Sequence, residues 1–248
     1  IPGDEVLVTG YDLGMNTDGG FGEYIRVPSG WVVRKPASLS LEDCMIYGTA
    51  GFTAALGIDR MLTMGQDPEA GPVVVTGATG GVGSMAVARL SKIGFEVLAA
   101  TGKEDARNYL LDLGAKEVVG RDEVDDQSGR PLLRPKWAGG FDTVGGNILD
   151  TVLKACNVHG SVASCGNASS FKLNTTVFPF ILNGVNLLGV NSATCQMPHR
   201  RKLWDKLAGE WKVEQLDTIK NLIGLDELSH NIDEILQGRI VGRVVVGY

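Results

Sequence analysis

Short apolar runs alternate with amphipathic stretches from residue 72 onward, and this alternation sets the expected fold. The apolar runs have the length of buried strands, and the stretches between them have the periodicity of helices. Such alternation is typical of a parallel sheet covered by helices on both faces. It predicts an α/β protein with a doubly wound parallel sheet, the Rossmann fold. The expected strands are 73–76, 96–100, 117–119, 141–144, 160–165 and 186–190, and the expected helices are 83–93, 105–113, 148–156, 176–182 and 198–209.

The residues before this region indicate a smaller β-rich part. Residues 6–8 and 23–27 have the composition of short strands, and a glycine-rich stretch separates them. The pattern changes near Pro36, and Ser40, followed by acidic residues, predicts the start of a helix. A helix at 232–237 and an apolar strand at 239–248 end the sequence and are expected to return to the first part. We therefore divide the chain into a partial β domain (1–36), a Rossmann domain (37–215) and a returning segment (216–248).

Charge and cysteine placement narrow the class of protein. The net charge of −6 over 248 residues argues against a nucleic acid or an anionic membrane as partner. No run reaches the roughly 18 apolar residues of a membrane span, and the first residues do not have the pattern of a signal peptide, so a cytoplasmic location is expected. Cys44, Cys156, Cys165 and Cys195 form no C-x-x-C pair, which predicts reduced, mostly buried thiols and no metal site.

A glycine-rich turn joins the strand at 73–76 to the helix that follows. Gly77, Gly80 and Gly83 have the spacing G-x-x-G-x-x-G in place of the more usual G-x-G-x-x-G. Without Cβ atoms the main-chain amides can approach a pyrophosphate, and the start of the helix adds its positive dipole end. The alternative is a structural turn that binds nothing. The first interpretation predicts a dinucleotide site at Thr79, Gly80, Gly81, Val82 and Gly83.

The end of the strand at 96–100 favours NADPH over NADH. NAD-binding domains usually place an acidic residue there for the ribose 2′-hydroxyl. This chain has Thr101, Gly102 and Lys103 instead, and Arg121 follows the next strand. A hydroxyl, a bare main chain and two cations would suit a 2′-phosphate. The alternative is that each cation is a solvated surface charge.

Further motifs spread over the whole chain, at 3–6, 19–24, 48–54, 78–83, 101–103, 121–123, 141–145, 165–167, 179–182 and 238–239. In these motifs the chain resembles the zinc-independent quinone oxidoreductase branch of the medium-chain dehydrogenases/reductases. Within that branch it is similar to the YhdH/YhfP-like acrylyl-CoA reductase group. Zinc-dependent relatives carry a cysteine-rich lobe and a catalytic cysteine near Gly48, and this sequence has neither.

The resemblance implies a GroES-like catalytic domain beside the Rossmann domain, with NADPH as hydride donor. It implies an acyl-CoA substrate, acrylyl-CoA reduced at its β-carbon to propionyl-CoA, or alternatively a quinone. It adds Asn167, Ile181 and Ser192 to the expected cofactor contacts. A homodimer is also implied, and we expect the sheet edge at 185–192 to form its contact.

Two features remain open at this stage, and the catalytic residues are not identified. Thr49 either contacts the nicotinamide or caps the helix that follows it, within a turn expected at 48–54 between the domains. The basic run Arg200, Arg201 and Lys202 either binds CoA phosphates or is solvated. A catalytically inactive NADPH-binding protein and a zinc-free alcohol dehydrogenase are the competing functions.

Overall fold

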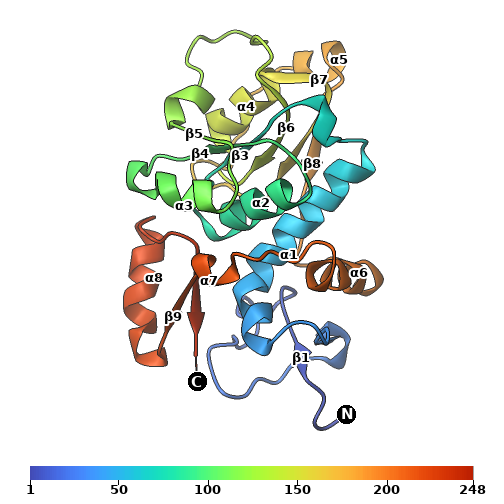
Figure 1. Cartoon of the computed structure of the whole chain (residues 1–248), viewed down its shortest axis with the longest axis vertical. Helices are drawn as coiled ribbons and strands as arrows, with labels where there is room; N and C mark the ends of the chain where they lie inside the picture. The colour runs from blue at the N-terminus through green and yellow to red at the C-terminus, as the bar shows by residue number, and fades with distance from the viewer. Residues whose placement is uncertain (248) are drawn as a thin grey trace.

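A six-stranded parallel sheet forms the centre of the computed structural model, which describes residues 1–247 (Figure 1). The strand order is β5-β4-β3-β6-β7-β8, so the winding direction reverses between β3 and β6. The predicted doubly wound α/β fold is confirmed. The strands are β3 (Val73–Thr76), β4 (Val97–Ala100), β5 (Glu117–Val119), β6 (Trp137–Asp142), β7 (Cys156–Ser164) and β8 (Asn186–Gly189).

Helices cover both faces of this sheet, which explains why its strands are continuously apolar. In β3, Val73 and Val75 belong to the hydrophobic core on one face of the sheet, whereas Val74 belongs to the core on the other face. All three valines are fully buried, and full burial of each stabilises the fold by about 1.5–3 kcal/mol. The helices of this part are α1 (Leu41–Thr63), α2 (Gly81–Lys92), α3 (Arg107–Asp112), α4 (Gly146–Lys154), α5 (Phe178–Leu182) and α6 (Met197–Ala208).

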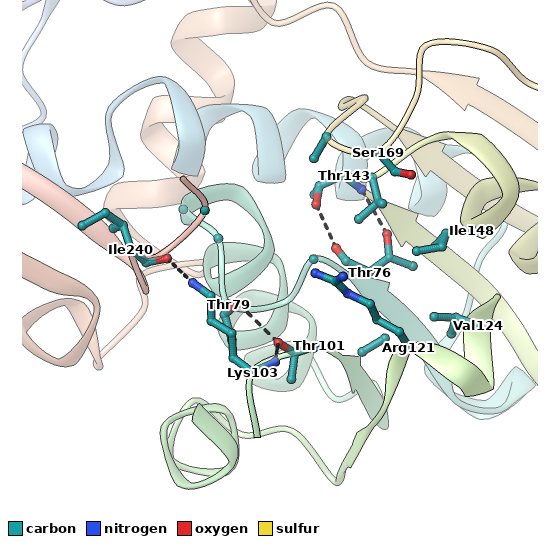
Figure 2. A pocket seen from close by; sticks show the side chains of 18 of the residues that line it. Thr76, Thr79, Thr101, Lys103, Arg121, Val124, Thr143, Ile148, Ser169 and Ile240 are labelled. Atoms are coloured by element: carbon teal, nitrogen blue, oxygen red, sulfur yellow. Dashed lines mark hydrogen bonds between the residues drawn. The ribbon is translucent and has the colours of Figure 1, made fainter. Parts of the chain in front are cut away.

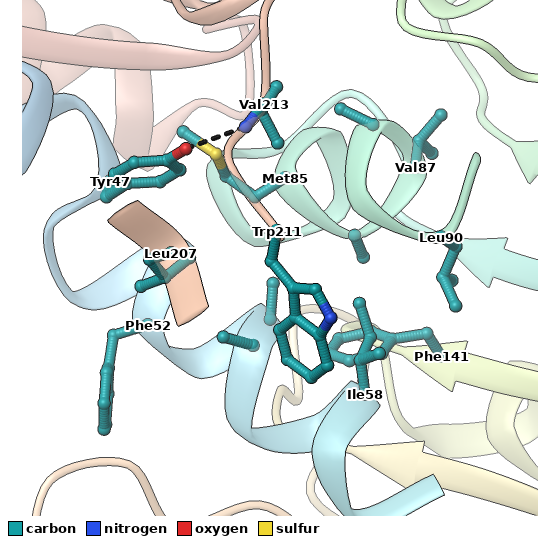
Figure 3. Packing of buried hydrophobic residues seen from close by; sticks show 14 of the residues in the cluster. Tyr47, Phe52, Ile58, Met85, Val87, Leu90, Phe141, Leu207, Trp211 and Val213 are labelled. Carbon is teal, nitrogen blue, oxygen red and sulfur yellow. Dashed lines mark hydrogen bonds between the residues drawn. The ribbon is translucent and has the colours of Figure 1, made fainter. Parts of the chain in front are cut away.

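The larger core lies between α1, α2 and the sheet (Figure 3). Tyr47, Phe52 and Trp211 are buried within it, and the Tyr47 hydroxyl accepts a hydrogen bond from the Val213 amide at 2.9 Å. Arg89 of α2 is also fully buried and lies over the Tyr47 ring. The core therefore connects the first long helix with the segment that follows α6.

Two strands begin earlier than the apolar pattern predicts. β6 starts at Trp137 and includes Gly139 and Gly140. A glycine pair is typical of turns, so the apolar pattern does not predict a strand at these residues. A Cβ on Gly140 would lie 2.6 Å from Val152 of α4, so close helix packing selects glycine here. β7 starts at Cys156 and contains a bulge, where His159 has a positive φ of 63°.

The helix start at Ser40 is confirmed, but the turn expected at 48–54 is wrong. Ser40 and Asp43 form a reciprocal capping box at the start of α1. Residues 48–54 lie inside this 23-residue helix, which is interrupted at Gly48 with φ 46° and ψ −150°. A Cβ on Gly48 would lie 2.8 Å from Arg243 Nη2, so the interruption lets a distant side chain pass.

The first 36 residues contain less regular structure than expected. β1 (Val6–Leu7) pairs antiparallel with β2 (Val33–Arg34), which agrees with the first predicted strand. Residues 23–27 do not form a strand, because no segment within residues 1–247 pairs with them, and Tyr24 is exposed. An extended segment needs a hydrogen-bonding neighbour to become a strand.

The final part forms a separate two-stranded parallel sheet. The short α7 (Leu216–Ile219) leads into β9 (Lys220–Ile223), which pairs with β10 (Arg243–Val246). α8 (Leu228–Leu236) lies between the two strands in the sequence. The predicted helix and last strand are present here, whereas β9 lies outside the predicted strands. The division at 1–36, 37–215 and 216–248 stays a prediction.

Three other expectations concern surfaces and thiols. β8 ends the sheet, so the segment proposed for a dimer contact does lie at a sheet edge, while the dimer itself stays a prediction. All four cysteines are free; Cys165 is half-buried and the other three are buried, as expected. Among the described helices none has the length and apolar character needed to cross a membrane.

Candidate functional site

A cavity of about 610 Å³ opens at the carboxyl ends of β3, β4 and β6, where the sheet reverses its winding direction (Figure 2). Ligands of doubly wound proteins bind at this position. The turns after β3, β4 and β6 and the start of the loop after β5 line the cavity, and residues from 235 to 244 line it from the C-terminal part. It brings together seven of the predicted contacts: Thr79, Gly80, Gly81, Thr101, Gly102, Lys103 and Arg121.

The glycine-rich turn after β3 forms one wall. Gly77 has a φ of 59°, and a Cβ there would collide with Thr143 Oγ1. A Cβ on Gly83 would collide with the Gly77 carbonyl, so this glycine lets α2 pack directly on the turn. The cap residue Gly80 offers no side chain to the first turn of α2. The amides at the start of this twelve-residue helix therefore suit an anion in the cavity.

A buried carboxylate, Asp142, holds together the strand ends that lie beside the cavity. Asp142 at the end of β6 accepts hydrogen bonds from Thr76 Oγ1 at 2.7 Å and from the Gly145 amide at 3.0 Å. Ser164 Oγ of β7 donates to the same carboxylate at 3.3 Å. Burial raises the pKa of Asp142 above 3.8, and these hydrogen bonds act in the opposite direction. The carboxylate thus ties together the ends of three neighbouring strands.

The end of β4 carries the polar residues predicted for a 2′-phosphate. Thr101 is buried, and its Oγ1 accepts a hydrogen bond from the Lys103 amide at 3.1 Å. Arg121 extends into the cavity from the turn after β5 (Figure 2). A Cβ on Gly102 would lie 2.6 Å from Arg121 Nε, so the missing side chain makes room for the guanidinium. Within residues 1–247 Arg121 forms no ion pair, which leaves its charge available.

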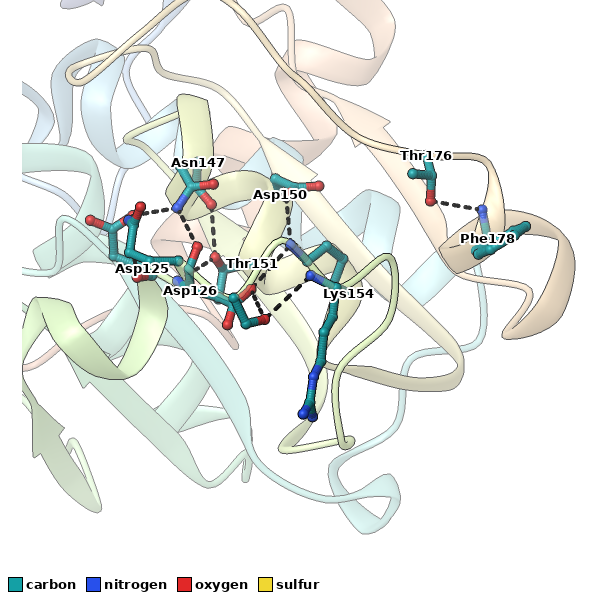
Figure 4. A network of polar contacts seen from close by, with 11 residues as sticks. Asp125, Asp126, Asn147, Asp150, Thr151, Lys154, Thr176 and Phe178 are labelled. Carbon is teal, nitrogen blue, oxygen red and sulfur yellow. Dashed lines mark hydrogen bonds and ion pairs between the residues drawn. The ribbon is translucent and has the colours of Figure 1, made fainter.

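A polar network anchors the loop after β5 to α4 (Figure 4). Asn147 Nδ2 donates to Asp125 Oδ1 at 2.6 Å and to the Asp126 carbonyl at 2.8 Å. Lys154 Nζ, which is mostly buried, lies 3.3 Å from Asp126 Oδ2. These contacts hold the loop that begins at Arg121 and engage Asp125, an acidic residue of the cavity lining.

Arg243 is a lining residue that sequence analysis missed. Its side chain runs from α2 to the interruption in α1: a Cβ on Gly81 would lie 2.8 Å from Arg243 Cδ, and Nε donates to the Ile46 carbonyl at 3.2 Å. Burial lowers the pKa of Arg243, and no carboxylate of residues 1–247 pairs with it. Arg243 is half-buried, and a cation held beside the positive end of a helix favours an anion nearby. The only signal in the sequence is one arginine at the head of an apolar strand.

Six predicted contacts do not line this cavity: Thr49, Val82, Gly83, Asn167, Ile181 and Ser192. Thr49 is exposed beside the interruption of α1, and its carbonyl accepts a hydrogen bond from Thr53 Oγ1 at 2.6 Å. The same Thr53 hydroxyl donates to Ser192 Oγ at 2.7 Å. Cofactor contacts at these six positions stay predictions.

For Arg200 both alternatives considered for the basic run, binding of CoA phosphates and exposure to solvent, are wrong. It is 1% exposed, and it donates to the Thr9 carbonyl at 2.8 Å and the Ser192 carbonyl at 2.8 Å. Its guanidinium lies 4.6 Å from the ring centres of both Tyr11 and Phe52. Arg200 therefore connects the N-terminal part to the loop after β8. Arg201 and Lys202 are exposed, and their role stays a prediction.

The zinc-binding dehydrogenase family model matches residues 81–208, just over half of the chain, and the chain belongs to this family of oxidoreductases. This agrees with the expected place among the medium-chain dehydrogenases/reductases. The described residues contain no group of three or more His, Cys, Asp or Glu positioned to hold a metal ion.

Particular relatives match almost the whole chain. The Bacillus subtilis protein called "Putative quinone oxidoreductase YhfP" is 46% identical over 98% of this chain and 74% of its own length. Acrylyl-CoA reductase AcuI of Ruegeria pomeroyi is 41% identical over 99% of this chain and 74% of its own length.

Two solved structures share the fold. The YhdH oxidoreductase from Salmonella enterica in complex with NADP has a TM-score of 0.96 and 43% identity, covering 99% of this chain and 75% of that one. Bacillus subtilis YhfP with NAD bound has a TM-score of 0.97 and 45% identity, covering 100% of this chain and 76% of that one.

Proposed function

We propose that the protein is an NADPH-dependent reductase of activated alkenes, with acrylyl-CoA reduced to propionyl-CoA as its reaction. One observation carries the proposal: the start of α2, which has no side-chain cap, meets Arg243 and Arg121 at one cavity at the switch point of the sheet, and neither arginine has a carboxylate partner within residues 1–247. The relative named acrylyl-CoA reductase supports the substrate class.

The residues present fit a dinucleotide with an additional phosphate. The amides at Gly80 and Gly81, together with Arg243, would hold the diphosphate, because no Cβ separates the main chain from the ligand there. Arg121 would hold the 2′-phosphate. Val124 and Ile148 line the cavity near Arg121 and offer apolar surface to the adenine ring (Figure 2).

The proposal favours NADPH even though one similar structure holds NAD. An acidic residue at the end of β4, which would repel a 2′-phosphate, is replaced by Thr101, Gly102 and Lys103. Asp125 also lines the cavity and keeps its negative charge, and Asn147 of α4 donates a hydrogen bond to its Oδ1. The cation of Arg121 and the missing acidic residue at the end of β4 support this preference.

When bound, NADPH would supply the hydride that the β-carbon of the activated alkene accepts, and a proton taken up at the α-carbon would complete the saturated thioester. The protein positions the dinucleotide: the glycine turn and Arg243 would hold its diphosphate. The hydrogen bonds of Asp142 hold the ends of the strands beside the cavity in place. A quinone as hydride acceptor is the second candidate, and the name of the Bacillus subtilis relative favours it.

Oxidation of NADPH followed by absorbance, with acrylyl-CoA or 1,4-benzoquinone as acceptor, tests the proposal. Turnover with acrylyl-CoA and formation of propionyl-CoA, seen by mass spectrometry, would support it. Arg243→Met should abolish this turnover, whereas Arg134→Met, which removes an exposed cation outside the cavity, should not. Turnover with the quinone alone would select the second candidate. NADPH binding without turnover of either acceptor would indicate a non-catalytic nucleotide-binding protein.

A further inference from the structure

A short segment of the C-terminal part, residues 238–243, closes one side of the cavity, and we name it the strap. Two hydrogen bonds attach it to the Rossmann domain. Lys103 Nζ donates to the Ile240 carbonyl at 2.7 Å (Figure 2), and the Gly242 amide donates to the Thr79 carbonyl at 2.9 Å. The strap is therefore held by the ends of two neighbouring turns, those after β4 and β3.

The two attachment points are themselves connected. Thr79 Oγ1 and Thr101 Oγ1 lie 3.4 Å apart and are both buried. Thr101 Oγ1 in turn accepts from the Lys103 amide, which fixes the main chain from which the lysine side chain extends. Lys103 is half-buried, and burial lowers its pKa. Its ammonium group is thus directed to a carbonyl acceptor and is not a freely solvated surface charge.

The strap determines where Arg243 lies. Gly242 has a φ of 72°, and a Cβ there would collide with the Ile219 carbonyl. The main chain at this position is therefore closely packed and requires glycine. Arg243 follows directly, and its side chain passes Gly81 at the start of α2. Attachment at Ile240 and Gly242 therefore fixes the direction in which the guanidinium leaves the strap.

We propose that Lys103 is a positioning residue: its ammonium latches the strap and so holds Arg243 at the start of α2, while selection of a 2′-phosphate depends on Arg121. The two cations at the end of β4 and β5 then have different tasks. The part of this inference that concerns dinucleotide affinity rests on the proposed function; the part that concerns the strap does not.

Hydrogen–deuterium exchange of the ligand-free protein tests the latch directly. Lys103→Met should raise amide exchange in the strap, residues 238–243, by about tenfold, because a hydrogen bond from a charged group is lost. Lys103→Arg keeps a donor and should restore most of the protection. Arg121→Met removes the neighbouring cation and should leave exchange in the strap unchanged. Unchanged exchange in Lys103→Met would overturn the latch.

Dinucleotide titrations separate the two tasks. Lys103→Met should weaken NADPH and NADH by the same factor, about tenfold, because Arg243 serves the diphosphate that both share. Arg121→Met should weaken NADPH alone. A loss confined to NADPH in Lys103→Met would show that this lysine binds the 2′-phosphate and would refute the proposal. If the unaltered protein binds neither dinucleotide, the proposed function fails, and the exchange experiment still decides on the latch.

Discussion

Replacement of Arg121 by glutamine is the sharpest test of cofactor preference. The change removes the charge and keeps much of the side chain. Lys103 Nζ donates to the Ile240 carbonyl, whereas Arg121 has no ion-pair partner among residues 1–247, so we assign the 2′-phosphate to Arg121. We therefore expect Arg121→Gln to weaken NADPH while the affinity for NADH stays the same.

The size of the effect follows from the exposure of the guanidinium. A hydrogen bond to a charged group contributes about 1.5–3 kcal/mol, and solvent screening reduces this at an exposed side chain such as Arg121. The lower limit, about 1.5 kcal/mol, corresponds to a roughly tenfold loss of NADPH affinity. The difference between variant and wild type should shrink as salt rises, because exposed charges are screened.

Fluorescence titration with both dinucleotides measures this preference. Gly102→Ala provides a second test, since its Cβ would lie 2.6 Å from Arg121 Nε and would displace the guanidinium without removing it. This variant should show a smaller loss in the same direction. An unchanged ratio of NADPH to NADH affinity in Arg121→Gln would refute the assignment of the 2′-phosphate to this residue.

Three further predictions concern the anion cradle formed by the start of α2 and Arg243, the buried Arg200, and the ion pair of Asp59. Gly81→Val should weaken both dinucleotides by roughly tenfold in the same titration, because its Cβ would lie 2.8 Å from Arg243 Cδ. Arg200→Ala should lower the free energy of unfolding by about 3 kcal/mol or more in urea denaturation, since it leaves buried carbonyl acceptors without a donor. Burial alone would raise the pKa of Asp59, but hydrogen bonds from Lys206 and His199 outweigh it and lower this pKa below 3.8. Asp59→Asn should therefore cost about 1 kcal/mol at neutral pH, and this difference should vanish in acid as wild-type Asp59 becomes protonated.

The sequence predicts the sheet well because its signals are local. Each strand is buried on both faces, so it appears as an apolar run, as Val73, Val74 and Val75 show. The glycine turn is also local, and its position at the cavity follows once strand and helix are placed. The early start of β6 is not predictable in this way, because Gly139 and Gly140 are selected by the closeness of neighbouring elements.

Side chains that act between distant segments escape sequence analysis. Arg200 looks like part of an exposed basic run, but its burial depends on Tyr11 and Phe52, which come from other parts of the chain. Arg243 likewise acquires its role only when the strap meets Gly81 and Gly48. Spacing along the sequence does not show which distant side chains come into contact, because these contacts depend on the fold.

The position of Arg243 in β10 also bears on how the site is assembled during synthesis. The ribosome makes the glycine turn first and β10 only after more than half of the chain has followed. The nascent Rossmann domain therefore has a sheet and a helix start before it has the cation that completes the anion cradle. Nucleotide cannot stabilise the nascent chain through the whole site until translation has passed β10, so any folding of the sheet before that point depends on its own core.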